Sequence, residues 1–232
     1  MLRSINYKFS KIPEKFVLLK KYRANRLTFA KKFIEDSIEP ARIVFSDEKR
    51  FNLNGCDSYS TWNNVTRSRY RFRKMIRSPG VMIWGMICAN GLFSFKVLHG
   101  NQNSLKYIET IKNHAIRCIK LNLGPDFIFQ QDNCPCHTSR ETLNFFKANN
   151  INLLDWPPYS PDINLIENVW PILSKLVYQD GHPKNIKDLI MKIELGAKII
   201  NETKREDIMN IYKSFLHRLC DLIETRGNHL NY

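Results

Sequence analysis

Three acidic residues occupy positions where a carboxylate is costly unless something compensates its charge. Asp132 follows the apolar run 127–131, and Glu167 follows 35 positions later (167 − 132) within an apolar helical stripe. The β-branched and aromatic run 42–46 ends on a third acid, Asp47. A divalent metal is the commonest compensation that also does chemistry, and oxygen ligands without thiolate or imidazole favour magnesium or manganese over zinc. We therefore expect these three acids to form a metal site.

The same acids have ordinary structural interpretations. Asp47 could be a turn acid, Asp132 a cap at the end of a strand, and Glu167 one half of a salt bridge. If they converge, two divalent ions about 3.5–4 Å apart could activate an attacking hydroxyl and stabilise the leaving oxygen in phosphodiester cleavage. The elements that carry the acids decide between these alternatives.

Polar neighbours of the acids are candidates for supporting roles. Glu48 is either a supporting acid or a solvated neighbour, whereas Asn133 and Asn168 could orient the acids by hydrogen bonding. His137 could move a proton or contact phosphate, although the sequence favours a simple role at the entry of a helix. These four residues therefore form a possible second layer around the site.

Two other motifs have a functional and a structural interpretation. The run Cys134-Pro135-Cys136-His137 resembles half of a zinc site, but no second cluster is visible, so a structural zinc is not expected. Trp156 and Tyr159 in the proline-rich loop could stack on a base, although packing of the loop is equally compatible with the sequence.

The charge balance points to a polyanionic partner. The 232 residues include 36 Lys+Arg and 22 Asp+Glu, a net charge of +14, which indicates nucleic acid first and an acidic membrane second. Basic and apolar residues alternate in one segment, which could lie along a phosphate backbone as an extended ribbon or be a solvated hairpin arm. Its candidate DNA-binding residues are Arg67, Arg69, Arg71, Arg73, Lys74 and Arg77.

Apolar periodicity predicts an α/β fold with a mixed sheet flanked by helices. The chain has no run of 18 or more apolar residues and no signal-peptide core, so we expect a soluble, intracellular protein whose six cysteines are reduced thiols. Pro171 should make the helix that carries Glu167 start late or bend, and Asp162 should cap that helix. The predicted strands are 42–46, 51–53, 81–89, 92–98, 127–131 and 151–154, and the predicted helices include 22–38, a helix from Leu105 to near Gly124, 186–200 and 206–224.

Three sequence blocks carry a family resemblance. FSDEKRF around Asp47, QQDNCPCH around Asp132 and WPPYSPDINLIENVW around Glu167 resemble the signature blocks of the Tc/mariner superfamily of DDE transposases. The 34 residues between the last two acids (167 − 132 − 1) match the Tc branch. The resemblance implies a ribonuclease H-like, five-stranded mixed sheet, a catalytic triad of these acids, and two Mg²⁺ ions that Mn²⁺ can replace.

The same resemblance implies cut-and-paste transposition, in which water cleaves at the transposon end and the freed 3′-hydroxyl attacks target DNA. It further implies DNA as the partner, a homodimer, a nuclear location, and neither a membrane partner nor a small-molecule cofactor. Residues 22–232 would form the catalytic domain with its C-terminal helices. Residues 1–21 would be a basic linker or the remnant of a DNA-binding region, since relatives carry paired helix-turn-helix domains upstream.

The chain departs from the family where relatives usually carry Pro and this sequence has Leu165. Two alternatives to a transposase catalytic domain stay open at this point. One is a non-catalytic, basic DNA-binding or dimerising remnant or a domesticated transposase, and the other is a ribonuclease H-type nuclease acting on RNA–DNA hybrids.

Overall fold

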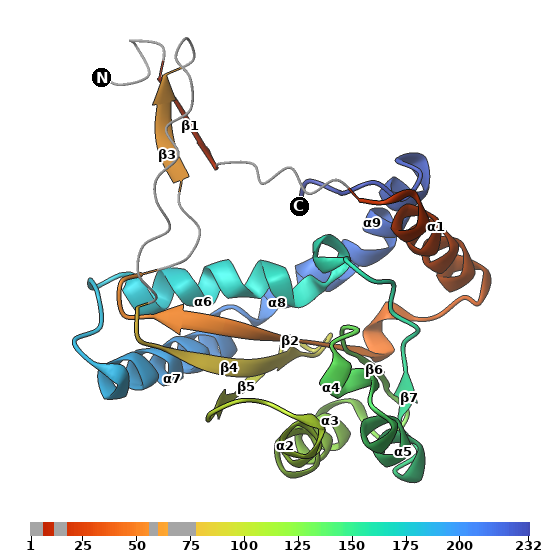
Figure 1. Ribbon diagram of the computed structural model, residues 1–232, viewed down its shortest axis with the longest axis horizontal. Coiled ribbons are helices and arrows are strands. Elements are labelled where there is room, and N and C mark those ends of the chain that lie inside the picture. The colour runs from red at the N-terminus through yellow and green to blue at the C-terminus, as the bar shows by residue number, and fades with distance from the viewer. Residues whose placement is uncertain (1–6, 12–17, 56–59, 65–77) are drawn as a thin grey trace.

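The computed structural model describes residues 7–11, 18–55, 60–64 and 78–232 (Figure 1). The strands are β1 (Tyr7–Lys11), β2 (Ile43–Asn52), β3 (Ser60–Asn64), β4 (Gly80–Ile87), β5 (Phe93–Leu98), β6 (Ile128–Gln130) and β7 (Asn152–Leu153). The α-helices are α1 (Lys20–Glu35), α2 (Ser104–Thr110), α3 (Ile116–Leu123), α4 (Pro135–Thr138), α5 (Arg140–Ala148), α6 (Val169–Tyr178), α7 (Ile186–Thr203), α8 (Arg205–Lys213) and α9 (Phe215–Glu224). Short helical turns are η2 (Pro40–Arg42), η3 (Ile111–Ala115), η4 (Pro161–Ile163) and η5 (Leu165–Asn168). Within the described ranges, no helix is long and apolar enough to cross a bilayer.

Five strands form one mixed sheet in the order β5-β4-β2-β6-β7. Strand β4 is antiparallel to β2 and β5, whereas β6 is parallel to β2 and β7. This topology confirms the predicted α/β class with a mixed sheet, and it puts β2 and β6 side by side in the centre. Strands β1 and β3 pair antiparallel as a separate two-stranded sheet, so the segment predicted as a linker contains a strand.

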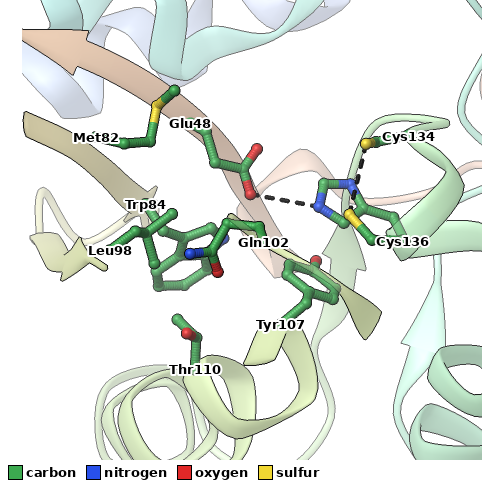
Figure 2. Close-up of a pocket in the computed structure, with 10 residues that line it drawn as sticks. Glu48, Met82, Trp84, Leu98, Gln102, Tyr107, Thr110, Cys134 and Cys136 are labelled. Atoms are coloured by element: carbon green, nitrogen blue, oxygen red, sulfur yellow. Dashed lines mark hydrogen bonds and ion pairs between the residues drawn. The ribbon is translucent and has the colours of Figure 1, made fainter. Parts of the chain in front are cut away.

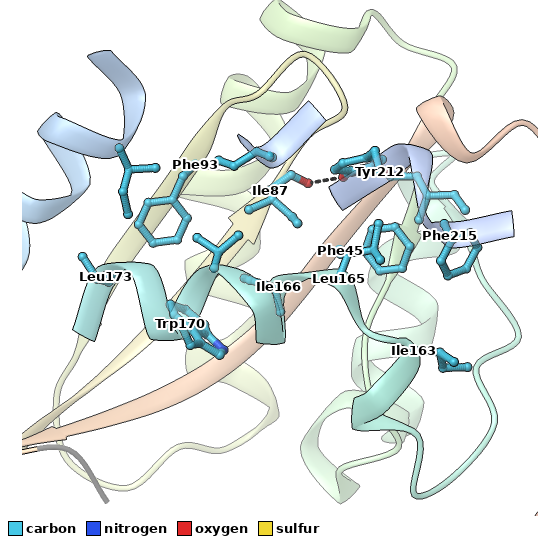
Figure 3. Close-up of a cluster of buried hydrophobic side chains, with 14 of the residues drawn as sticks. Phe45, Ile87, Phe93, Ile163, Leu165, Ile166, Trp170, Leu173, Tyr212 and Phe215 are labelled. Carbon is cyan, nitrogen blue, oxygen red and sulfur yellow. Dashed lines mark hydrogen bonds between the residues drawn. The ribbon is translucent and has the colours of Figure 1, made fainter. Parts of the chain in front are cut away.

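Helices cover both faces of the five-stranded sheet because its central strands alternate their apolar side chains. Ile43 and Phe45 of β2 lie in the cluster formed with α1 and α6 to α9. Figure 3 shows Phe45 in this cluster near Phe215. Val44 lies in the opposite cluster, which includes residues of α3 and α5. On β4, Ile83 lies in the first cluster and the next residue, Trp84, lies in the opposite one. The period-two alternation of a strand thus builds two cores from one sheet.

Three predicted boundaries are wrong. The strands expected at 42–46 and 51–53 are one continuous β2, because β4 pairs with β2 from Phe45 to Asn52. The helix expected from Leu105 is divided into α2 and α3 by the π-helical turn η3. The last expected helix is divided at Ser214 into α8 and α9. In β2, the correction places the acidic residues in the middle of a strand and not at its exit.

The segment that carries Glu167 starts late, as Pro171 predicts. The 3₁₀ turn η5 comes first, and α6 begins only at Val169, which places Pro171 in the first turn where a helix needs no amide donor. The prediction that Asp162 caps this helix is wrong. Asn164 caps η5 through its side-chain oxygen, which accepts from Ile166 N–H at 3.3 Å.

Asp162 instead forms a buried ion pair with Arg26 of α1. The fully buried Arg26 guanidinium donates to both carboxylate oxygens at 2.7 and 2.6 Å. It also donates to the carbonyls of Tyr159, Gly227 and Asn228 at 3.2, 3.0 and 3.1 Å. One side chain therefore joins α1, the loop that leads to Glu167 and the C-terminal segment.

Replacing Arg26 with Met should lower the free energy of unfolding by about 3–5 kcal/mol, because it leaves the Asp162 carboxylate buried without its partner. Urea unfolding followed by circular dichroism measures this loss. Arg42→Met is the matched control, since the Arg42–Asp126 pair is 42% and 83% exposed and should contribute less than about 1 kcal/mol. Equal losses in the two variants would contradict this account of the buried pair.

Candidate active site

Two of the predicted acids lie at the same edge of the sheet for a topological reason. Strands β2 and β6 are parallel, and Phe45 pairs with Gln130 at the end of their ladder. Asp47 and Asp132 each lie two residues beyond that pair, so both follow the point where the parallel ladder ends. Beyond it, the described strands flank β2 on one side only, where β4 pairs with it and Asp47 lies opposite Gly85.

A chain of buried hydrogen bonds connects the segments of all three acids. Ser46 N–H donates to Gln130 Oε1 at 3.1 Å, and Ser46 Oγ–H donates to the Gln130 carbonyl at 2.8 Å. The Asn164 amide donates to the Ser46 carbonyl at 3.1 Å. Ser46 precedes Asp47 by one residue, Gln130 precedes Asp132 by two, and Asn164 precedes Glu167 by three. We call Ser46, Gln130 and Asn164 the polar tie.

The polar tie is buried, so losing one of its hydrogen bonds would destabilise the fold more than losing an exposed one. Ser46, Gln130 and Asn164 are 3%, 0% and 5% exposed. A polar group that is buried without a partner costs about 1–3 kcal/mol, so these residues favour the arrangement in which they meet. Sequence reasoning missed them. The available signal was a polar residue inside the otherwise apolar runs that lead to the acids.

The Asp47 carboxylate is oriented by α6. Trp170 Nε1–H donates to Asp47 Oδ2 at 2.9 Å, and the indole lies against Gly85, where an added Cβ would lie 2.4 Å from Trp170 Cη2. Burial first, and then the charge of Glu167, raise the pKa of Asp47 to about 7 despite the Trp170 hydrogen bond. Burial also raises the pKa of Glu167, although the charge of Lys49 opposes this shift. The two acids thus form a region of poorly compensated negative charge.

The Asp132 carboxylate is held by groups from its own turn. Asp132 Oδ1 lies 2.6 Å from His137 Nδ1 and accepts from Cys134 N–H at 2.9 Å. Burial alone would raise the pKa of Asp132, but these two hydrogen bonds outweigh it and keep the pKa below its ordinary value. The other imidazole nitrogen of His137 lies 3.3 Å from Glu48 Oε1 (Figure 2). Burial lowers the pKa of His137, but the two carboxylates outweigh it and raise that pKa to about 10.

His137 is held in place from two directions. The Tyr107 ring lies against the imidazole with centroids 4.0 Å apart. Tyr107 O–H donates to Gln131 Oε1 at 2.8 Å, and Gln131 Nε2–H donates to the His137 carbonyl at 3.0 Å. His137 is therefore a contact of Asp132 and Glu48 as well as a residue of α4, whereas the sequence favoured the helical role alone.

The remaining candidate residues have mixed outcomes. Asn133 does not contact an acid in the structure, because its amide donates to the Trp156 carbonyl at 2.9 Å. Asn168 Oδ1 is buried and accepts no hydrogen bond. Trp156 is 7% exposed and packs in the core against α1 and β2, so loop packing is its role, while the Tyr159 ring lies against Tyr22. The predicted DNA-binding residues Arg67, Arg69, Arg71, Arg73, Lys74 and Arg77 lie outside the described residues.

The donor chemistry around the acids suits a hard divalent cation. Among the described residues, no group of three His, Cys, Asp or Glu side chains lies close enough together to hold a metal ion. Burial nevertheless raises the pKa values of Asp47 and Glu167, a shift that Lys49 opposes only at Glu167, and Asn168 Oδ1 is a buried oxygen that accepts no hydrogen bond. Asp132 would have to turn from His137 to join them. The residue types fit Mg²⁺ or Mn²⁺.

Asp47→Asn should change how stability depends on pH in metal-free buffer. The Asp47 pKa is about 7 when folded and 3.8 in the reference state, so the folded state binds the extra proton between these values and stability falls as pH rises through that window. The Asn variant lacks this titration. When the pH rises from 5 to 8, its free energy of unfolding should therefore increase relative to that of wild type by on the order of 1–3 kcal/mol.

Urea unfolding at both pH values with a chelator present measures this difference. Asp36→Asn, at an exposed position just after α1, is the matched control. If the Asp47→Asn and wild-type curves shift equally with pH, the raised pKa of Asp47 is wrong.

Comparison with known proteins agrees with this geometry. A model of the DDE superfamily endonuclease family matches residues 42–190, a span that contains Asp47, Asp132 and Glu167. The transposable element Tc3 transposase of Caenorhabditis elegans is 33% identical over 214 residues, covering 91% of this chain and 64% of that protein. The Tcb1 transposase of Caenorhabditis briggsae is 29% identical over 218 residues, covering 91% and 78%. The chain thus spans just under two thirds of the Tc3 relative.

Solved structures show the same fold. The Mos1 transposase paired-end complex with left transposon end has a TM-score of 0.75 at 16% identity, covering 99% of this chain and 70% of that chain. The catalytic domain of Mos1 mariner transposase has a TM-score of 0.70 at 14% identity, covering 93% and 98%. These likenesses confirm the ribonuclease H-like fold, and the family model and the Tc3 relative confirm the resemblance to the Tc/mariner superfamily of DDE transposases. Because the family model covers more than half of its residues, the chain belongs to the DDE superfamily endonuclease family.

Proposed function

We propose that the chain is the catalytic domain of a DNA transposase that cleaves and joins DNA strands with divalent metal. The observation that carries this proposal is the alignment of Asp47 and Asp132 at the end of the β2–β6 ladder, with the polar tie bringing the segment of Glu167 to the same place. The names of its relatives, which are transposases, support the same reading.

In this proposal Asp47, Asp132 and Glu167 hold two Mg²⁺ ions, which Mn²⁺ can replace. When bound, such ions activate the attacking hydroxyl and stabilise the leaving oxygen. The hydrogen bond from Trp170 fixes the orientation of the Asp47 carboxylate. Burial of Asp47 and Glu167 limits the access of water to both carboxylates. His137 holds Asp132 and Glu48, and Asp132 would have to leave His137 to help hold the metal.

The proposed substrates are transposon-end and target DNA. The net charge of +14 favours a polyanionic partner, and one of the structural neighbours is a complex with a transposon end. We place the contacts with DNA on the basic segment from Arg67 to Arg77, and we propose a homodimer that acts in the nucleus.

Asp132→Asn should abolish Mg²⁺- or Mn²⁺-dependent nicking of duplex DNA while leaving the fold intact. The amide oxygen can still accept the hydrogen bonds from His137 and Cys134, but the variant lacks the charge that a divalent ion requires. The nicking rate on supercoiled plasmid should fall at least about 100-fold, since a metal contributes several kcal/mol of charge stabilisation. Asp126→Ala is the matched control, because the Asp126 side chain is 83% exposed and its loss should leave nicking unchanged.

The same assay separates the alternatives. Nicking that survives Asp132→Asn would contradict the proposed site. Salt-sensitive DNA binding with no nicking in either metal would instead identify a non-catalytic DNA-binding remnant. Preferential cleavage of RNA–DNA hybrid over duplex DNA would identify a ribonuclease H-type nuclease.

A further inference from the structure

Two cysteines lie in contact beside the candidate active site. Cys134 Sγ and Cys136 Sγ are 3.4 Å apart (Figure 2). Both side chains are half-buried, and both line a pocket of about 200 Å³ whose wall also includes Glu48, Tyr107 and His137. A molecule of the size of a peroxide can therefore reach either sulfur from this pocket.

We propose that Cys134 and Cys136 are a modification site, an oxidisable pair that a peroxide converts into a reversible disulfide. One thiol gains an oxygen atom from hydrogen peroxide to become a sulfenic acid, and one water is released. The second sulfur then displaces that oxygen, which leaves as a second water, and the S–S bond forms. The two sulfurs lose two electrons in total, and the peroxide is reduced to two water molecules.

The other described cysteines are poorly placed for this reaction. Cys88 is fully buried in the core, where a peroxide does not reach its thiol. Cys118 is half-buried on α3, and Cys220 is exposed on α9, a helix that packs against α1. Neither contacts the pocket beside Asp132, which makes Cys118 and Cys220 useful internal references.

Closing the disulfide should disturb the turn that holds Asp132. The sulfurs must approach from 3.4 Å to about 2.05 Å. Cys134 N–H donates to Asp132 Oδ1 at 2.9 Å, and the Cys134 carbonyl accepts from His137 N–H at 2.8 Å. A shift of Cys134 therefore moves both groups that hold the Asp132 carboxylate. The effect on cleavage rests on the proposed function, whereas formation of the disulfide does not.

Peptide mapping tests the modification directly. Cleavage after Lys and Arg releases residues 121–140 as one peptide, which contains Cys134 and Cys136 and no other cysteine. After treatment of the folded chain with stoichiometric hydrogen peroxide, this peptide should lose two hydrogen atoms in mass and resist alkylation, and dithiothreitol should reverse both changes. Peptides containing Cys118 or Cys220 should stay alkylatable. A 121–140 peptide that stays reduced, or that only gains oxygen atoms, overturns the proposal.

The functional consequence is measured on the same samples. Metal-dependent nicking by wild type should fall at least tenfold on oxidation and recover with dithiothreitol, whereas Cys136→Ser should show the same rate before and after peroxide. Cys220→Ser is the matched control and should lose activity on oxidation as wild type does. A disulfide that forms without any change in nicking refutes the effect on Asp132. A reduced wild-type chain that does not nick DNA refutes the proposed function and leaves the mapping result to decide the modification.

Discussion

The hydrogen bond from the Asn164 amide to the Ser46 carbonyl connects two segments that are 118 positions apart in sequence. Because Ser46 is also bonded to Gln130 through both its amide and its hydroxyl, this contact completes a junction of three segments. Each of these segments continues directly into one of the acids. The geometry of the candidate active site thus depends on a few buried polar groups, whose hydrogen bonds to one another form only when β2, β6 and η5 meet in one register. Gln130 Nε2 has no hydrogen-bond partner in this arrangement.

The acids beyond this junction lie in two electrostatic environments. Asp47 and Glu167 are close enough for the charge of one to raise the pKa of the other, and burial acts on both in the same direction. Asp132 faces His137, which also contacts Glu48 and whose positive charge is balanced by the two carboxylates. A divalent cation would relieve the repulsion in the first environment and compete with an imidazole in the second. The Cys134–Cys136 pair lies on the turn between Asp132 and His137.

The sequence was sufficient to predict the mixed sheet and the late start of α6, because each depends on local patterns such as apolar runs and a proline. It was insufficient where the determining contact is distant. Gln130 reads as one more residue of a strand, and Arg26 reads as a surface residue of an amphipathic helix. Their roles follow only from partners that lie 84 and 136 positions away. The continuous β2 was missed because its charged middle reads as a turn, although β4 pairs along it.

The central claim is that the polar tie aligns the acids for a divalent cation, and Mn²⁺ binding followed by electron paramagnetic resonance tests it most directly. Asn164→Ala should weaken Mn²⁺ binding by about tenfold or more, equivalent to about 1.4 kcal/mol, in protein whose circular dichroism spectrum matches that of wild type. Asn122→Ala, at an exposed position of α3, should bind Mn²⁺ as wild type does. An Asn164→Ala protein that keeps its fold and binds Mn²⁺ with wild-type affinity would contradict the account.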